Sequence, residues 1–174
     1  LTDASTVFGQ GDTHDHILNL SSQLADTQFG LAHGTQTLGF GDDIYFDNGL
    51  ASNIAGNGGR DILVMRDGDD EVHADDKPDL VFGGLGNDIL EGNRGDDLMF
   101  GNEGMDNLIG GYGYDILDGG ADSDALSGEF GSDLMFGGGG NDALDGGFGN
   151  DVIYGDSGIS LAQFRFWVIT QFLG

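Results

Sequence analysis

The chain has 174 residues, of which 31 are acidic and only 5 are Lys or Arg, giving a formal net charge of −26. This balance excludes nucleic acid and acidic membrane surfaces as partners, because phosphate binding requires clustered basic side chains. Its 35 glycines and single proline would suit a disordered tail, but the strict sequence period described below argues against disorder.

The first part of the chain, residues 1–37, contains no repeat. Its best apolar run is DHILNLSSQL, residues 15–24. We expect this segment to form an N-terminal cap or a segment that contacts a partner.

A nine-residue phrase fills most of the remaining chain. It occurs eleven times from Gly56 to Tyr154 without a register slip, and its clearest copy is GGLGNDILE, residues 83–91. LGFGDDIYF, residues 38–46, lies upstream in the same frame. A phrase this short cannot enclose its own core, so the copies must stack on one another as a solenoid, which we expect over residues 38–158.

Each position of the phrase, numbered one to nine from Gly83, has its own preference. Positions one, two and four favour glycine, which indicates a turn. Position six is Asp in all eleven copies. One inward side chain between two outward ones is typical of a three-residue strand, and position eight is apolar throughout. Its residues are Leu63, Val72, Val81, Leu90, Met99, Leu108, Leu117, Leu126, Met135, Leu144 and Ile153.

A turn followed by a short strand, repeated, predicts an all-β coil in which two phrases complete one turn and two parallel sheets face each other. Residues eighteen apart then lie on adjacent rungs, about 4.8 Å apart. This spacing sorts the position-six aspartates into two ladders. One contains Asp43, Asp61, Asp79, Asp97, Asp115, Asp133 and Asp151, and the other contains Asp70, Asp88, Asp106, Asp124 and Asp142.

Stacked carboxylates repel each other by several kcal/mol in a poorly hydrated site unless a cation lies between them. Carboxylates together with the carbonyls of a glycine turn are hard oxygen ligands, which favour calcium over zinc or copper. Magnesium suits such a site less well, because it resists dehydration and prefers a strict octahedron. The alternative is that these aspartates only cap their own turns, but a turn cap does not require Asp at one position of eleven successive copies.

With these positions assigned, residues 38–158 resemble the RTX (repeats-in-toxin) nonapeptide, GGxGxDxUx, where U is a large apolar residue. The resemblance implies a right-handed parallel β-roll with non-repeat caps at both ends. It also implies calcium ions held in the turns by the two Asp ladders and by backbone carbonyls of glycine-turn residues. The glycines to which we assign this role are Gly84, Gly86, Gly95, Gly104, Gly111, Gly113, Gly131, Gly138, Gly140, Gly147 and Gly149.

Three copies depart from the pattern. Lys77 and Asp122 replace the position-four glycine, and Ser52 stands where the ligand Asp is expected. We therefore regard the sites beside Lys77 and Ser52 as the least secure.

The resemblance also implies export. Proteins of this family are usually secreted by a one-step (type I) bacterial machine, so we expect an extracellular or cell-surface location. We expect a calcium-folded structural module and no enzyme activity within these residues. The alternative is the C-terminal calcium-binding and secretion module of a larger secreted enzyme, such as an epimerase, protease or lipase.

The outward positions seven and nine differ between the two predicted sheets. On the sheet that follows Asp61, thirteen of fourteen outward side chains are apolar, and Asp118 is the exception. A stripe of this length exceeds the apolar patch that soluble monomers normally expose. Its cover could be the chain's own N-terminal segment or apolar tail, a second copy of the chain or a neighbouring domain. The predicted interface consists of Ile62, Leu80, Phe82, Leu98, Phe100, Leu134, Phe136, Val152 and Tyr154.

The final segment, residues 159–174, is the most apolar stretch, ISLAQFRFWVITQFLG. It contains Arg165 and is shorter than the roughly 18 residues that a membrane span requires. We expect a terminal strand or short helix that caps the open end of the solenoid or takes part in association.

Overall fold

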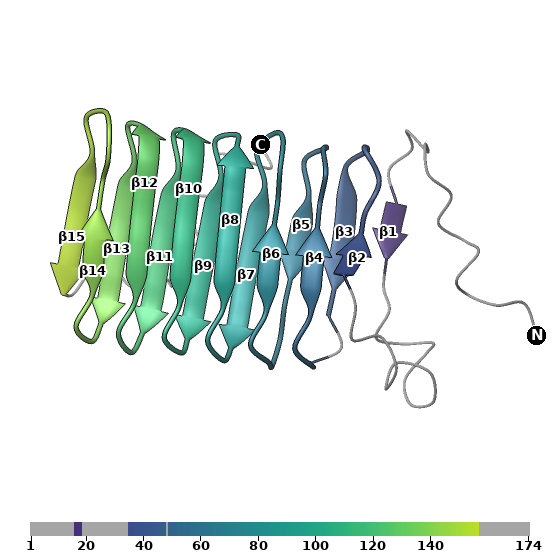
Figure 1. The fold of residues 1–174 in the computed structure, drawn as a ribbon, viewed down its shortest axis with the longest axis horizontal. Helices are drawn as coiled ribbons and strands as arrows, with labels where there is room; N and C mark the ends of the chain where they lie inside the picture. The colour runs from purple at the N-terminus through teal and green to yellow at the C-terminus, as the bar shows by residue number, and fades with distance from the viewer. Residues whose placement is uncertain (1–15, 19–34, 48, 157–174) are drawn as a thin grey trace, which may run out of the picture.

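The computed structural model describes residues 16–18, 35–47 and 49–156. In this part of the chain the regular elements are all β-strands, stacked along one axis as a flattened coil (Figure 1). The described residues form no helix long and apolar enough to cross a membrane. The N-terminal cap expected over residues 1–37 is described only at 16–18 and 35–37, and the expected cap over residues 159–174 lies outside the described residues.

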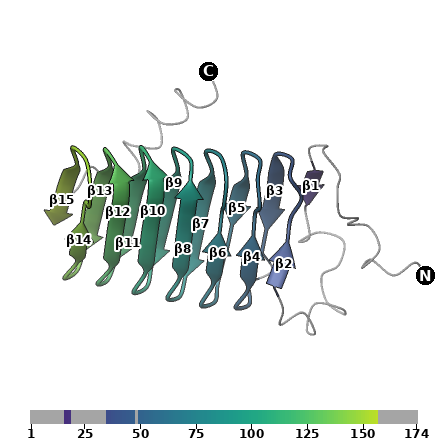
Figure 2. The ribbon, with the colours of Figure 1, turned by 45° about the horizontal axis from the view of Figure 1, so that its top comes forward.

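Two parallel sheets face each other across the coil (Figure 2). Sheet A contains, in spatial order, β1 (His16–Leu18), β3 (Asp43–Phe46), β5 (Ile62–Val64), β7 (Leu80–Leu85), β9 (Leu98–Glu103), β11 (Ile116–Ala121), β13 (Leu134–Gly139) and β15 (Val152–Asp156). Sheet B contains β14 (Ala143–Asp145), β12 (Ala125–Gly131), β10 (Asn107–Gly113), β8 (Ile89–Arg94), β6 (Glu71–His73), β4 (Asn53–Ala55) and β2 (Thr35–Thr37). The predicted β-solenoid is confirmed.

The register follows the eighteen-residue spacing that the repeat predicts. Leu63 pairs with Val81 and Val81 with Met99 in sheet A, and the same spacing holds throughout sheet B. β1 differs, because His16 lies opposite Asp43, which is 27 residues later.

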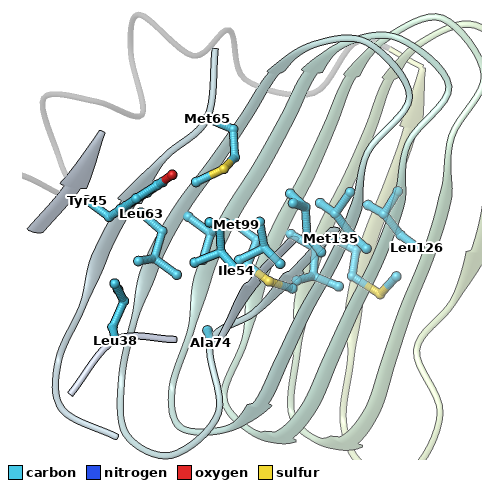
Figure 3. Close-up of a cluster of buried hydrophobic side chains, with 14 residues drawn as sticks. Leu38, Tyr45, Ile54, Leu63, Met65, Ala74, Met99, Leu126 and Met135 are labelled. Atoms are coloured by element: carbon cyan, nitrogen blue, oxygen red, sulfur yellow. The ribbon is translucent and has the colours of Figure 1, made fainter. Parts of the chain in front are cut away.

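The position-eight side chains fill the space between the sheets. Nine of them, from Leu63 to Met135, are buried, whereas Leu144 is partly buried and Ile153 is exposed on the last rung. Figure 3 shows this column, which Tyr45 and Ile54 continue toward the N-terminal end. The repeated apolar position therefore builds one continuous core along the axis.

The strands in the middle of the roll are longer than the three residues predicted. β7 to β13 have six or seven residues and extend through positions one to three of the following phrase. Gly84 pairs with Asn102, for example, and Gly111 with Glu129. Stacked turns with the same backbone path can pair N–H to C=O whatever their side chains, so glycine does not end the ladder here.

Leu108 and its neighbour Asn107 offer a matched test of this core. Leu108 is fully buried and Asn107 is exposed. Leu108→Ala should lower the free energy of unfolding by about 2–5 kcal/mol, because it leaves a cavity between the sheets. Asn107→Ala should change it by no more than about 0.5 kcal/mol. Urea denaturation of the folded chain under one set of ionic conditions measures both values, and equal effects would contradict the described orientation.

Candidate metal centres in the turns

The two Asp ladders form along the edges of the roll, as the spacing predicts. From Asp43 to Asp133, the backbone N–H of each ladder Asp donates to Oδ1 of the Asp eighteen residues later, over 2.7 to 3.1 Å. The N–H of Asp97, for example, donates to Asp115 Oδ1 over 2.8 Å. Each carboxylate is therefore fixed by the backbone of the preceding rung.

The second oxygen of these carboxylates has no such partner. Nine Oδ2 atoms in the described part of the chain are buried and accept no hydrogen bond: those of Asp61, Asp70, Asp79, Asp88, Asp97, Asp106, Asp115, Asp124 and Asp133. A buried polar atom without a partner costs about 1–3 kcal/mol, and more when it is charged. Repeating this cost nine times indicates that these oxygens require a ligand from outside the chain.

The position-one glycines leave the space into which Oδ2 projects. A Cβ placed on Gly110 would lie 2.5 Å from Asp115 Oδ2. On Gly101 it would overlap both Asp106 Oδ2 and the carbonyl oxygen of Gly119. A side chain at position one would thus fill the cradle beside the carboxylate.

The donors around each cradle are oxygens. The carbonyl oxygen of the next position-one residue faces it: a Cβ on Gly83 would lie 2.8 Å from the carbonyl oxygen of Gly101. Among the described residues, no three His, Asp or Glu side chains form a group that could hold a metal by themselves. A cation bound here would therefore combine carboxylates with backbone carbonyls, which is a calcium type of coordination and unlike the His and Cys sites of zinc.

Burial strongly perturbs the acidity of the ladder. It raises the pKa of Asp61, Asp97 and Asp115 from 3.8 to about 7, despite the opposing effect of the backbone N–H bond to each. The pKa of Asp79 rises to about 9 for the same reason. Without a cation the roll thus holds carboxylates that resist ionisation at neutral pH.

The cradle is filled in the turns nearer the N-terminal end. Met65 and Ala74 occupy position one before Asp70 and Asp79, and both side chains pack in the core. Complete glycine cradles accompany Asp61 and each position-six Asp from Asp88 onward. The position-four and position-six pattern marks the sites beside Lys77 and Ser52 as the least secure, and it does not cover these exceptions at position one.

The turn at Ser52 is closed by the chain itself. Asp47 stands at position one, fully buried, and its Oδ1 accepts hydrogen bonds from Ser52 Oγ at 2.8 Å and from the Tyr45 hydroxyl at 3.3 Å. Its Oδ2 accepts from the backbone N–H of Gly49 at 2.6 Å and of Leu50 at 3.3 Å. This carboxylate has protein donors on both oxygens, so the turn is stable without a cation.

The position-four replacements keep the shape of the turn. Lys77 and Asp122 adopt φ values of 91° and 74°, in the left-handed region that glycine occupies elsewhere. The carbonyl oxygen of Lys77 points at Gly95, as that of Gly86 points at Gly104. The glycines assigned as carbonyl ligands lie in these turns, and their role stays a prediction. The position-one carbonyls that face Oδ2 were missing from that assignment.

Sequence reasoning also missed position five. Its side chains accept a hydrogen bond from the backbone N–H eighteen residues later, as Asp69 does from Asn87 and Asp96 from Tyr114, both over 2.9 Å. Positions five and six therefore bond to opposite neighbours and hold each turn from both sides. The recurrence of Asp, Asn and Ser at position five was the available signal.

The two ends of the Asp ladders differ in burial. Asp43 is buried at the N-terminal end and donates its backbone N–H to Asp61 Oδ1. Asp142 and Asp151 are only half-buried on the last rungs. The best-enclosed cradles are therefore those between Asp88 and Asp133.

Comparison with known proteins agrees with this geometry. The family model of the RTX calcium-binding nonapeptide repeat matches residues 66–99, 100–135 and 127–160. No curated protein and no solved structure matches the chain. The matches span more than half of the chain and fall on the ladders and cradles described above. The chain therefore belongs to the RTX family of calcium-binding nonapeptide-repeat proteins.

Proposed function

We propose that the chain is a secreted structural module whose folding is driven by calcium. The observation that carries this proposal is the set of nine buried carboxylate oxygens without a protein donor. A metal-free roll must either keep these groups protonated or leave buried charges uncompensated. Calcium removes that penalty, and the role is structural rather than catalytic.

The ligands belong to two neighbouring rungs. In a site between them, Oδ2 of a position-six Asp and the carbonyl oxygens of the surrounding glycine turns would hold the ion. Calcium supplies positive charge to an acidic turn, and the N–H bond to Oδ1 keeps the carboxylate in place. Magnesium fits less well, because it requires a near-ideal octahedron of ligands. Here the positions of the ligand oxygens are fixed by the repeating backbone.

The sites act together. Extracellular calcium modules bind with dissociation constants of about 10⁻⁴ to 10⁻³ M. At about 1 mM calcium each such site adds about 0.4–1.4 kcal/mol to folding. Asp70 and Asp79 are two of the nine, and their cradles are filled by Met65 and Ala74. The seven remaining sites, if equal, would add about 3–10 kcal/mol, which is comparable to the whole stability of a typical domain. The chain would then be expanded at submicromolar cytosolic calcium and folded outside the cell.

Folding also assembles a contact surface. The apolar face is the outer side of sheet A, defined by Ile44, Phe46, Ile62, Val64, Leu80, Phe82, Leu98, Phe100, Ile116, Asp118, Leu134, Phe136, Val152 and Tyr154. Its end at β15 is open, with Val152 and Tyr154 47 % and 48 % exposed. We propose that the module associates with a second copy or a neighbouring domain through this face, once calcium has formed it.

A calcium titration tests the calcium-driven fold. Circular dichroism should show strand signal appearing cooperatively as calcium rises toward millimolar levels, and magnesium at the same concentration should have little effect. Sedimentation velocity of the same samples measures association, which should grow with protein concentration only when calcium is present. Full strand signal in excess chelator at pH 8 would refute the calcium-driven fold, and a monomer at every concentration would refute self-association.

Asp97 and Asp96 form a matched pair for testing the ligands. Asp97→Asn removes a charge from a buried cradle, so the calcium concentration at the folding midpoint should rise several-fold. Asp96→Asn removes the same charge from an exposed neighbour, and the Asn can still accept the N–H bond of Tyr114. Its midpoint should stay nearly unchanged. Equal shifts for the two variants would mean that net charge alone controls folding.

The stability of the metal-free folded chain should fall as pH rises, which is opposite to the usual effect of carboxylates in folded proteins. The pKa of Asp61, Asp97 and Asp115 is raised from 3.8 to about 7 on folding, so the folded state binds protons more tightly than the unfolded state. Stability from this source is full below about pH 4 and is lost as pH rises through about 7. Strand signal in chelator should therefore fall between pH 5 and pH 8.

With calcium present the trend should reverse, because protons and calcium compete for the same oxygens. The calcium midpoint should fall as pH rises from 6 to 8. Circular dichroism at fixed ionic strength measures both trends. A metal-free strand signal that grows with pH would contradict the described burial of the ladder.

A further inference from the structure

A groove crosses the C-terminal parts of β8, β10 and β12 on the outside of the roll; these strands are neighbours in sheet B (Figure 1). Its volume is about 400 Å³, which is within the range of ligand sites. The lining residues come from five successive rungs, from Asn57 to Glu129, which extend over about 19 Å along the axis. None of them belongs to the Asp ladders or to the apolar face, so the groove is a separate feature of the roll.

Gly111 creates the space in the middle of this groove. It pairs with Asn93 on one side and with Glu129 on the other, and both of these residues carry polar side chains. Because Gly111 brings no side chain, a gap is left between them. Its φ of 107° is unfavourable for other residues, and an added Cβ would overlap the carbonyl oxygen of Asn93. The gap is therefore fixed by the backbone.

The ring of Tyr112 lies beside the gap and has one face free. Its other face stacks on Phe130, with the ring centroids 4.7 Å apart and the planes at 3°. Phe130 stacks in turn on Phe148. On the free side the paired residue is Arg94, and in the described part of the chain neither a ring nor a guanidinium stacks there. Tyr112 is 56 % exposed, so the groove contains a flat apolar surface that a ligand can reach.

The polar side chains around this ring include both unused donors and unused acceptors. Arg94 is exposed and forms no ion pair within the described ranges, although four carboxylates line the same groove. These are Asp75, Asp76, Glu91 and Glu129. The carboxylates of Asp76 and Glu129 accept no hydrogen bond from the described residues. A ligand that satisfies the groove must therefore accept from a guanidinium and donate to carboxylates.

This requirement selects an uncharged ligand with many hydroxyl groups. An anionic ligand, such as a nucleotide, would satisfy Arg94 but would be repelled by the four carboxylates and by the net charge of −26. A cationic ligand would satisfy the carboxylates, but it would repel Arg94 and leave its N–H groups without an acceptor. A hydroxyl group both donates and accepts, so it can bond to a guanidinium and to a carboxylate alike.

We propose that the groove binds a neutral oligosaccharide, with one sugar ring stacked on Tyr112 and its hydroxyls bonded to Arg94 and Glu129. The C–H groups on one side of a sugar ring form an apolar face that packs against an aromatic ring. The length of the groove suits a chain of sugars better than a single one. The inference goes beyond calcium-dependent folding, but it rests on the folded roll, because only folding brings these rungs together.

An oligosaccharide array tests the ligand class. The full chain in millimolar calcium should bind neutral oligosaccharides and should not bind acidic or amino-sugar ones of the same length. Isothermal titration calorimetry with the best neutral oligosaccharide then measures the dissociation constant. Binding confined to acidic or to amino-sugar oligosaccharides overturns the inference, because either result means that charge, and not hydroxyl groups, determines recognition.

Two pairs of matched variants test the assigned residues. Tyr112→Ala should weaken binding of that oligosaccharide about tenfold or more, because the stacking surface is lost. Tyr114→Ala is its control, since Tyr114 is 66 % exposed and lies outside the groove. Arg94→Ala should also weaken binding, whereas Arg60→Ala removes an equally charged side chain elsewhere on the roll and should not. Equal effects of a variant and its control overturn the assignment of the groove.

Circular dichroism of the same samples separates this inference from the calcium-driven fold. A chain that shows strand signal with calcium but binds no neutral oligosaccharide overturns the inference alone. Absence of strand signal with calcium overturns the calcium-folded module, and the oligosaccharide site with it.

Discussion

The architecture depends on one recurring atom, the inward Oδ2 of a position-six Asp that no protein group satisfies. The neighbouring Oδ1 accepts a backbone N–H from the preceding rung, which holds the carboxylate in place and prevents the free oxygen from turning to solvent. The fold therefore concentrates unsatisfied negative charge along both edges. Such an arrangement is unfavourable by itself and becomes favourable with a divalent cation, so the free energy of folding and that of ion binding cannot be separated.

Because each carboxylate is positioned by the rung before it, no site is complete within one phrase. An ion bound near Asp115 depends on the backbone at Asp97, which itself depends on Asp79. Coupling between neighbours is the general behaviour of stacked repeats, whose stability is approximately a sum of repeat and interface terms. The turn at Asp47 lies near the N-terminal end of this coupled array. Its carboxylate accepts hydrogen bonds from Ser52 and Tyr45, so this turn does not need an ion.

The repeat was sufficient to predict the features that depend on spacing alone: the eighteen-residue register, the two Asp ladders and the core column from Leu63 to Met135. It failed where side chains from different rungs interact. Met65 and Ala74 occupy the cradles beside Asp70 and Asp79, although the Asp at position six of these phrases suggests that the sites are complete. Asp47, at position one, takes the place of the Asp that is missing at Ser52. Strand length was underestimated because glycine normally disfavours strands, whereas here identical turns pair regardless of side chain. The apolar composition of the outer face was visible in the sequence, but the near-complete burial of Leu98 within that face was not.

The inequality of the two sheets restricts how such an array can change in length. Removing or adding two phrases, eighteen residues, leaves every later side chain on the sheet it already occupies. Removing a single phrase shifts all later rungs by half a coil, so that Phe100 and Phe136 would move to the side of Glu71 and His73, and the apolar face would be cut in two. A protein that used its outer faces equally could vary by nine residues at a time. Here the unit of insertion, deletion or engineering is the pair of phrases, even though the unit visible in the sequence is the single one.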